Sequence, residues 1–251
     1  MSRNVVITGG AGGLGRVMSE LFLANGDRVH VGNVAFDADA RGARENLRLT
    51  ACDVGDSADV ARLFAEAAAW MPRIDVLVNN VGIAGPRAPL ESVSEQDWTR
   101  IIEVNLLGAV RCMQQVLPAM KAARSGVVLN VSTSSVLTRP LHRSPYNVSK
   151  AALEALTLSV AREAGPYGVR CNAIRPGMMD NERMHRVLRR VAEQSGKSVE
   201  TVLAEELKFI SMRCMVSMGE VARFALYLCS PEAAHITGQL VAIDGGAEWE
   251  S

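Results

Sequence analysis

The stretch NVVITGGAGGLG, residues 4–15, joins a short apolar run to a loop rich in glycine. The apolar run predicts a strand over 4–8, and the pattern that follows predicts a helix over 14–26 that ends at Gly26. A glycine loop between a strand and a helix lets the backbone approach a pyrophosphate, and the helix start offers free N–H groups. Glycine loops also occur in ordinary tight turns, but this context favours nucleotide binding.

Strand and helix patterns continue to alternate along the chain. Apolar runs predict further strands at 28–34, 47–54, 75–82, 126–132, 168–177 and 239–244. Helical patterns cover 57–70, where Asp56 or Ser57 could be the N-cap, then 94–120, and then the segment around Tyr146. Strands that are apolar throughout are typical of a parallel sheet buried on both faces. The sequence therefore predicts one α/β domain over residues 1–251, a doubly wound parallel β-sheet flanked by helices.

Residues 178–218 interrupt this alternation. The segment is rich in Met and Arg, is helical by pattern, and stands before the last helix and strand. Ligands of such sheets bind beyond the carboxyl ends of the strands. We therefore expect residues 178–218 to form a lid over a substrate.

The composition argues against several classes of function. Lys and Arg number 27 and are balanced by 27 Asp and Glu, and no basic run stands out. This argues against nucleic acid or an anionic membrane as a partner. The N-terminus lacks the apolar stretch of a signal peptide, and no later segment approaches a membrane span. The five cysteines are scattered without a CxxC pair, which predicts reduced thiols of a cytoplasmic protein and no metal site.

Tyr146 and Lys150 stand four residues apart in RSPYNVSKAAL, residues 143–153. The helical period places both side chains on one face, about one turn apart. A nearby ammonium favours phenolate and lowers the pKa of a phenol from its usual value of about 10. A surface helix could carry such a pair without function, so its meaning depends on the rest of the chain.

Six motifs carry a resemblance to a known family. They are TGGAGGLG (8–15), NNVG (79–82), Asn105, YNVSK (146–150), RPG (175–177) and ITGQLVAIDGG (236–246). In this order and spacing, essentially the whole chain resembles a classical short-chain dehydrogenase/reductase. The resemblance implies a Rossmann-type fold. It also implies an NAD(P)-dependent oxidoreductase that interconverts a secondary alcohol and a ketone by hydride transfer.

The resemblance assigns catalytic roles to individual residues. Tyr146 matches the acid/base, and Lys150 matches the lysine that binds the nicotinamide ribose and lowers the tyrosine pKa. Asn105 matches the asparagine that holds a proton-relay water, with a buried asparagine bonded to helix backbone as the alternative. Thr133 stands thirteen residues before the tyrosine, where the family usually has a serine that polarises the substrate oxygen.

The two serines next to Thr133 have different expected roles. Ser134 takes over the polarising role if the loop is one residue shorter than usual. Ser132 is expected to bond locally to the backbone.

The resemblance also assigns a cofactor site. Asp53 and Val54 match the pair that contacts adenine, and NNVG matches the strand end beside the adenosine ribose and diphosphate. The segment RPGMMDN, residues 175–181, matches the one that holds the carboxamide, with Asn181 where threonine is usual. The cofactor-binding residues are Gly9, Gly12, Gly13, Leu14, Gly15, Asn33, Asp53, Val54, Asn79, Asn80, Gly82, Tyr146, Lys150, Pro176, Gly177, Met179 and Asn181.

The choice between NAD and NADP depends on the end of the second predicted strand. An acidic residue there binds the ribose 2′-OH and repels a phosphate, but this sequence has Asn33. Relatives that use NADP place a basic residue where this chain has Gly12 or Val34. The loop that follows carries Asp37 and Asp39 instead. The sequence favours NAD(H) and leaves NADP(H) open.

Two other functions fit the same motifs less well. One is reduction of a 3-oxoacyl thioester, which Gly12 and Val34 count against because it normally uses NADPH. The other is a non-catalytic cofactor sensor, which the intact Asn105, Tyr146 and Lys150 disfavour. The small-molecule alcohol or ketone cannot be named from the sequence. Four arginines could meet a carboxylate or phosphate, although most arginines are solvated: Arg87, Arg139, Arg143 and Arg183.

The sequence also predicts a homo-oligomer. The helical segments 106–117 and 151–161 are more apolar than one sheet can cover, and exposed apolar stripes usually mark subunit contacts. Family relatives pair these helices about a two-fold axis and form a second two-fold contact with the C-terminal segment. We therefore expect a homotetramer. A dimer is the alternative if Trp249 and its acidic neighbours keep the second contact open.

Overall fold

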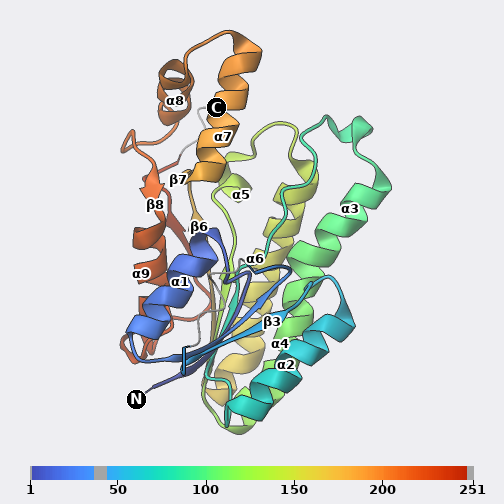
Figure 1. Cartoon of the computed structure of the whole chain (residues 1–251), viewed down its shortest axis with the longest axis vertical. Helices are drawn as coiled ribbons and strands as arrows, with labels where there is room; N and C mark the ends of the chain where they lie inside the picture. Colours follow the sequence, from blue (N-terminus) through green and yellow to red (C-terminus); the bar gives the residue numbers. More distant parts are fainter. Residues whose placement is uncertain (1, 37–43, 248–251) are drawn as a thin grey trace.

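The computed structural model describes residues 2–36 and 44–247, and Asp37, Asp39 and Trp249 lie outside this range. Within it, seven parallel strands form one sheet in the order β3-β2-β1-β4-β5-β6-β9 (Figure 1). The strands are β1 (Asn4–Thr8), β2 (Arg28–Asn33), β3 (Leu47–Ala51), β4 (Val76–Asn79), β5 (Gly126–Val131), β6 (Val169–Pro176) and β9 (Leu240–Ile243). Their order reverses at β1, which pairs with β2 on one side and β4 on the other. This is the switch point at which doubly wound folds bind ligands.

Helices cover both faces of the sheet. The side chains of Val5, Val6 and Ile7 in β1 have no exposed surface, as expected of a strand with both faces covered. One apolar core lies between the sheet and α1 and α9, and the other lies under α2, α4 and α6 (Figure 1). These helices are α1 (Gly13–Ala24), α2 (Ser57–Trp70), α4 (Gly108–Ala122), α6 (Ser144–Ala164) and α9 (Met218–Leu228). The predicted fold class is confirmed.

Local signals set several helix starts. The Asp56 carboxylate accepts hydrogen bonds from the backbone N–H groups of Ala58 and Asp59, so Asp56 rather than Ser57 caps α2. Helix α9 begins with a capping box formed by Ser217 and Glu220. Helix α1 has no side-chain cap, since its N-cap residue is a glycine. Its first N–H groups are therefore not satisfied by a capping side chain.

The helix predicted over 94–120 is interrupted in the structure. It consists of α3 (Glu95–Ile102), a π-helical turn η3 (Glu103–Leu107), and α4. The Asn105 side chain bonds outside the helix to the backbone of Ile83, and a Cβ on Gly108 would stand 2.8 Å from Val54 Cγ2. The π-helical turn therefore coincides with the hydrogen bonds of Asn105 and with the close approach of Gly108 to Val54. Hydrophobic periodicity reports neither of these contacts.

The segment 178–218 forms a helical unit at one end of the molecule (Figure 1). Its helices α7 (Glu182–Ser195) and α8 (Val199–Leu207) pack on each other through Leu188, Ala192 and Val202. The predicted helical character is confirmed. The strands β7 (Met179–Asp180) and β8 (Val216–Ser217), which were not predicted, pair in parallel and close the base of the unit.

The remaining elements are short. They are η2 (Leu90–Ser92), α5 (Ser135–Thr138), η4 (Gly165–Tyr167) and η5 (Pro231–Ala233). The thiols of Cys52, Cys112, Cys171 and Cys229 are buried, and that of Cys214 is exposed. In the described part of the chain, every helix is too short or too polar to span a bilayer.

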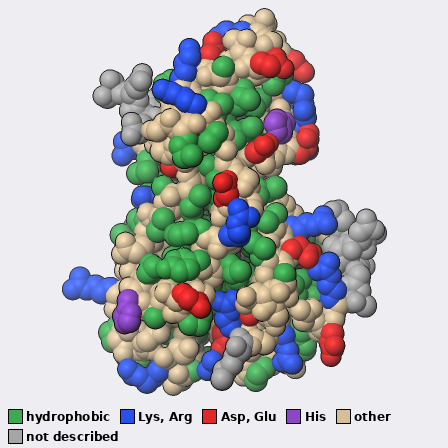
Figure 2. All heavy atoms as spheres, turned by 90° about the vertical axis from the view of Figure 1, so that its left-hand side faces the viewer, with side chains coloured by type: hydrophobic (Ala, Val, Ile, Leu, Met, Phe, Trp, Pro, Cys, Tyr) green, Lys and Arg blue, Asp and Glu red, His purple; other side chains and the backbone are tan. Residues whose placement is uncertain are grey.

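Apolar side chains also reach the surface. Figure 2, turned toward the α8 and α9 side, shows apolar side chains extending from the helical unit onto the main body. Tyr227 of α9 is exposed, as are Phe209 and Met212 in the connection from α8 to β8. On the outer side of α6, Val148 and Leu158 are about half exposed.

Candidate active site

The glycine loop follows β1 at the carboxyl edge of the sheet and leads into α1. Gly9 has a φ of 68°, and its N–H donates to the Gly32 carbonyl at 2.7 Å. A Cβ on Gly15 would stand 2.1 Å from the Gly9 carbonyl oxygen, so only glycine lets the helix start so close to the loop. A Cβ on Gly12 or Gly13 would meet nothing within 4 Å. The outer side of the loop is open to an approaching ligand, while the adjacent Leu14 side chain is buried in the core.

The two asparagines that end β4 fix the surrounding backbone. The Asn80 side-chain amide donates to the carbonyl oxygens of Thr8 at 3.2 Å and Gly9 at 3.1 Å, which holds the glycine loop in place. Asn79 points inward and donates to Asn130 at 2.9 Å. Its buried Oδ1 has no hydrogen-bond partner among the described residues. Neither side chain projects freely, so a cofactor would meet mainly the backbone of this segment.

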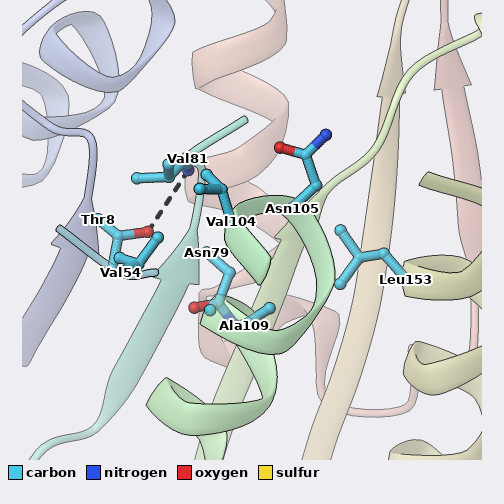
Figure 3. Close-up of a pocket in the computed structure, with 9 residues that line it drawn as sticks. Thr8, Val54, Asn79, Val81, Val104, Asn105, Ala109 and Leu153 are labelled. Carbon is cyan, nitrogen blue, oxygen red and sulfur yellow. Dashed lines mark hydrogen bonds between the residues drawn. The ribbon is translucent and has the colours of Figure 1, made fainter. Parts of the chain in front are cut away.

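A small pocket lies between β1, β4 and the start of α4. Figure 3 shows Thr8, Asn79 and Asn105 lining it together with apolar side chains, Val54 among them. The Asp53 carboxylate beside Val54 accepts from Arg100 at 2.6 Å and from the Gly55 N–H at 2.9 Å. Partial burial by itself raises the pKa of Asp53, but these hydrogen bonds outweigh burial and lower it. Asp53 is therefore held as a carboxylate.

Lys150 is the buried cation of the site. Its Nζ donates to the Val131 carbonyl, at the end of β5, at 2.7 Å. A Cβ on Gly82 would stand 3.0 Å from Nζ, so the ammonium also borders the segment after β4. Burial lowers the pKa of Lys150 from its usual 10.5 to about 8, although nearby Glu154 acts in the opposite direction. The lysine is charged at neutral pH and fixed at the carboxyl edge of the sheet.

A buried polar cluster that the sequence did not reveal supports this lysine. Glu154, one turn after Lys150, accepts from Arg175 Nε at 2.8 Å and from the Ser132 hydroxyl at 2.6 Å. The prediction that Ser132 bonds locally was wrong, because β5 and α6 bring it against a carboxylate 22 residues away. The i, i+4 spacing of Lys150 and Glu154 is a sequence signal that these two side chains are neighbours on one face of a helix. The contacts of Ser132 and Arg175 depend on the packing of α6 on the sheet.

Asn105 occupies the π-helical turn and bonds to the segment after β4. Its Oδ1 accepts from the Ile83 N–H at 2.8 Å, and its Nδ2 donates to the Ile83 carbonyl at 2.9 Å and to Ser149 Oγ at 3.0 Å. The side chain therefore ties the 80–83 segment to α6, one residue before Lys150. The bonds go to backbone outside the helices and to a serine of α6, so they differ from the predicted alternative, in which the asparagine bonds to helix backbone.

Tyr146 lies one turn before Lys150 on α6 and is half-buried. The Arg143 guanidinium stands over its ring, 4.8 Å from the centroid. The Thr133 hydroxyl is buried and bonds to Ser135, accepting from its N–H and donating to its Oγ, both at 3.2 Å. Ser134 is the N-cap residue of the short helix α5, and its own N–H donates to the Pro176 carbonyl at 3.0 Å. Both hydroxyl-bearing residues remain candidates for the polarising role.

The remaining predicted cofactor residues also lie at the carboxyl edge. Asn33 ends β2 as predicted, and its side chain donates to the Ala35 carbonyl. Pro176 ends β6, and the Gly177 N–H donates to the Ile243 carbonyl of β9 at 3.0 Å. Met179 lies in β7, and Asn181 caps α7 by accepting from the Met184 N–H at 2.9 Å. The Asn181 Oδ1 is thus engaged in capping, which leaves its Nδ2 for a ligand.

Comparison with known proteins identifies the family. A family model described as Enoyl-(Acyl carrier protein) reductase matches residues 9–248. The chain belongs to the short-chain dehydrogenase/reductase family. It is 34% identical over 249 residues to cis-4-hydroxycyclohexanecarboxylate dehydrogenase of Sinomonas cyclohexanicum, covering 97% of this chain and 96% of that one. It is 30% identical over 247 residues to a 3-oxoacyl-[acyl-carrier-protein] reductase of Thermotoga maritima, covering 96% of each.

A solved structure agrees with this assignment. Levodione reductase superimposes with a TM-score of 0.88 and 26% identity, over 97% of this chain and 96% of that one. The protein is therefore an oxidoreductase of this family, built on the fold that the sequence predicted.

Proposed function

We propose that this short-chain dehydrogenase/reductase interconverts a secondary alcohol and the corresponding ketone, with Tyr146 exchanging the proton at the substrate oxygen. The observation that carries the proposal is the placement of Lys150. A buried ammonium is bonded to the end of β5 one helical turn from a half-buried phenol. A fixed ammonium one turn away on the same helix is placed to stabilise negative charge that forms at the phenol oxygen during proton transfer.

The open glycine loop fits a dinucleotide cofactor. The free space beside Gly12 and Gly13 and the uncapped start of α1 suit a diphosphate. Asp53 and Val54 would hold the adenine, Gly82 and Lys150 the nicotinamide ribose, and 176–181 the carboxamide. When bound, the cofactor supplies or accepts the hydride at the substrate carbon.

The chain's own residues handle the proton. Tyr146 donates it to the oxygen when a ketone is reduced and accepts it when an alcohol is oxidised. The Thr133 hydroxyl, or that of Ser134, would hydrogen-bond the same oxygen. Asn105 keeps the segment after β4 against α6, and a relay water near Lys150 would return the proton to solvent.

NAD(H) is the cofactor we favour, with NADP(H) as the alternative. The Asn33 side chain at the end of β2 carries no negative charge to repel a phosphate, and Gly12 and Val34 supply no cation to attract one. Reduction of a 3-oxoacyl thioester is the second candidate function, because the description of the matching family model and the name of one relative both refer to reductases of acyl groups on an acyl carrier protein. The missing cation near the adenosine ribose weighs against it.

Assembly and location complete the proposal. We propose a cytoplasmic homotetramer, with a dimer as the alternative. Strand β9 is an edge of the sheet, and the half-exposed Val148 and Leu158 lie on the outer side of α6. Both surfaces suit two-fold contacts between identical chains.

The test is NADH or NADPH absorbance with a panel of alcohols and ketones, among them 4-hydroxycyclohexanecarboxylate and acetoacetyl thioesters. Replacing Tyr146 by Phe should lower turnover by about 10²–10⁴ and leave cofactor affinity nearly unchanged. Tyr167→Phe, at an exposed tyrosine, serves as the matched control. Wild-type turnover by Tyr146→Phe would refute the mechanism. Cofactor binding without turnover of any substrate would favour the sensor.

A further inference from the structure

Three arginines lie near one another beside Tyr146 at the start of α6. They are Arg87, Arg143 and Arg183, called here the arginine rim. The Arg143 guanidinium stands over the Tyr146 ring, 4.8 Å from its centroid. A group bound by this guanidinium would therefore lie against the phenol proposed to react.

The fold brings the rim together from three parts of the chain. Arg87 lies in the segment after β4 and Arg143 at the start of α6. These two segments are joined by a hydrogen bond from the Ala88 N–H to the His142 carbonyl at 3.2 Å. Arg183 lies in the first turn of α7, close enough for its charge to act on Arg143. The glycine-loop side of the site contributes no arginine to this group.

The rim lacks a negative partner within the described residues. None of its three side chains makes an ion pair or hydrogen bond there. The acidic groups closest to Arg183 in sequence are engaged elsewhere: Glu182 with Arg189 at 2.5 Å, and Asp180 with His185 at 2.7 Å.

The pKa of Arg143 reflects its burial and the charged groups around it. Burial lowers the pKa of Arg143, the neighbouring Tyr146 opposes that effect, and the charges of Arg87 and Arg183 lower the pKa further. No carboxylate is among the groups that act on it. Like charges that converge without a counter-ion are unfavourable, and a bound anion would relieve the repulsion.

We infer that the arginine rim binds a carboxylate carried by the substrate, beside the hydroxyl or keto group that reacts at Tyr146. The inference rests on the proposed function, because it places the substrate at that tyrosine. A planar guanidinium binds a carboxylate through two parallel hydrogen bonds and so fixes its orientation as well as its position. The rim would therefore select hydroxy or oxo acids and set which face of the carbonyl meets the hydride.

The position of Arg143 distinguishes a carboxylate from the phosphate of an acyl carrier. The phosphate of a pantetheine arm is separated from its thioester carbonyl by the whole length of the arm. An anion held against the Tyr146 ring must instead belong to a small molecule whose charged and reacting groups are close together. If the rim instead binds the phosphate of a long arm, the experiment will show it through a comparison of thioesters with and without that phosphate.

The experiment compares 4-oxocyclohexanecarboxylate with its carboxamide, which has nearly the same shape without the charge. The ratio of kcat/KM for the acid to that for the amide is measured in the wild type and in the double variant Arg87→Gln/Arg183→Gln. Affinity for both compounds is also measured by calorimetry in Tyr146→Phe saturated with NADH, which keeps the stacking ring and needs no turnover. Arg190→Gln is the control for the loss of one positive charge, since it removes an arginine from a solvent-exposed position of α7.

We expect the wild type to prefer the acid by about 10- to 100-fold, the usual effect of a hydrogen-bonded charged group. The double variant should lose most of this preference, Arg190→Gln should keep it, and Arg143→Lys should retain only part. Equal affinity of Tyr146→Phe for acid and amide, or equal kcat/KM for the two in the wild type, would overturn the inference. So would a rim-dependent preference for acetoacetyl-CoA over its N-acetylcysteamine analogue, because it would assign the rim to a phosphate. Tight binding of the acid by Tyr146→Phe, together with no turnover of the acid by the wild type, would uphold the inference and refute the proposed function.

Discussion

Replacing Lys150 by Met should abolish catalysis and at the same time change how the stability of the fold depends on pH. The ammonium is fully buried, and burial lowers its pKa from the usual 10.5 to about 8. Methionine has a similar length and no charge, so it fits the same space. The native protein therefore carries a destabilising charge that function requires.

The magnitude follows from the two pKa values. Converted at about 1.4 kcal/mol per pH unit, the lowering corresponds to about 3 kcal/mol of destabilisation. Below pH 8 the lysine is protonated in both folded and unfolded states, and this cost is present in full. Between pH 8 and 10.5 the folded state loses the proton first, so the cost shrinks as pH rises. The stability of the wild type relative to Lys150→Met should therefore rise by about 3 kcal/mol between pH 7 and 10.5.

Urea denaturation of both proteins without cofactor, at one protein concentration and several pH values, measures this difference. Both proteins are compared in a Tyr146→Phe background, which removes the phenol beside residue 150, so that the titrating groups away from residue 150 are common to both and cancel. Lys208→Met controls for the loss of a lysine, because that side chain is exposed. A difference between wild type and Lys150→Met that stays constant from pH 7 to 10.5 would show that the buried lysine is not perturbed.

Asn33→Asp should raise the ratio of kcat/KM for NAD to that for NADP at least several-fold, since the new carboxylate accepts from the ribose 2′-OH and repels a phosphate; an unchanged ratio would mean that Asn33 does not face the ribose. Gly15→Ala should weaken cofactor binding and lower the melting temperature, because its Cβ would stand 2.1 Å from the Gly9 carbonyl oxygen; wild-type affinity in calorimetry would contradict this. Thr133→Ala should reduce kcat more than Ser134→Ala, and the reverse order in steady-state assays would give the polarising role to Ser134. Sedimentation at micromolar concentration should show a tetramer, and a fully active monomer would refute the proposed assembly.

The sequence predicted the parts of the site that depend on local spacing. The glycine loop was placed by the apolar run before it, and Tyr146 and Lys150 were paired by the helical period. The end of β2 at Asn33 and the parallel sheet followed from apolar runs of strand length. In each case neighbouring residues in the chain were enough to fix the geometry.

The features of the site that the sequence did not predict depend on contacts between segments that are far apart in the chain. The ion pair of Glu154 with Arg175, and the hydrogen bond from Ser132, form only once α6 packs on β5 and β6. The π-helical turn at Asn105 coincides with its bonds to Ile83, 22 residues away. The sequence named Arg87, Arg139, Arg143 and Arg183 as candidates for binding an anion, but that the first, third and fourth of these lie near one another follows only from the fold.

The two-residue pairing of β7 with β8 has a consequence for how this protein can diversify. It brings the two ends of the helical unit together on one short ladder, with Met179 opposite Val216. The helices between them have their own small core. Residues of α7, α8 and the turn between them can therefore be lengthened, shortened or exchanged without changing the register of the sheet, whereas the segment after α8 is tied to Gly245 and Gly246 by the backbone of Ser211 and Met212. Descendants of this chain could acquire new substrates through changes in α7 and α8, while the geometry for hydride transfer is inherited unchanged.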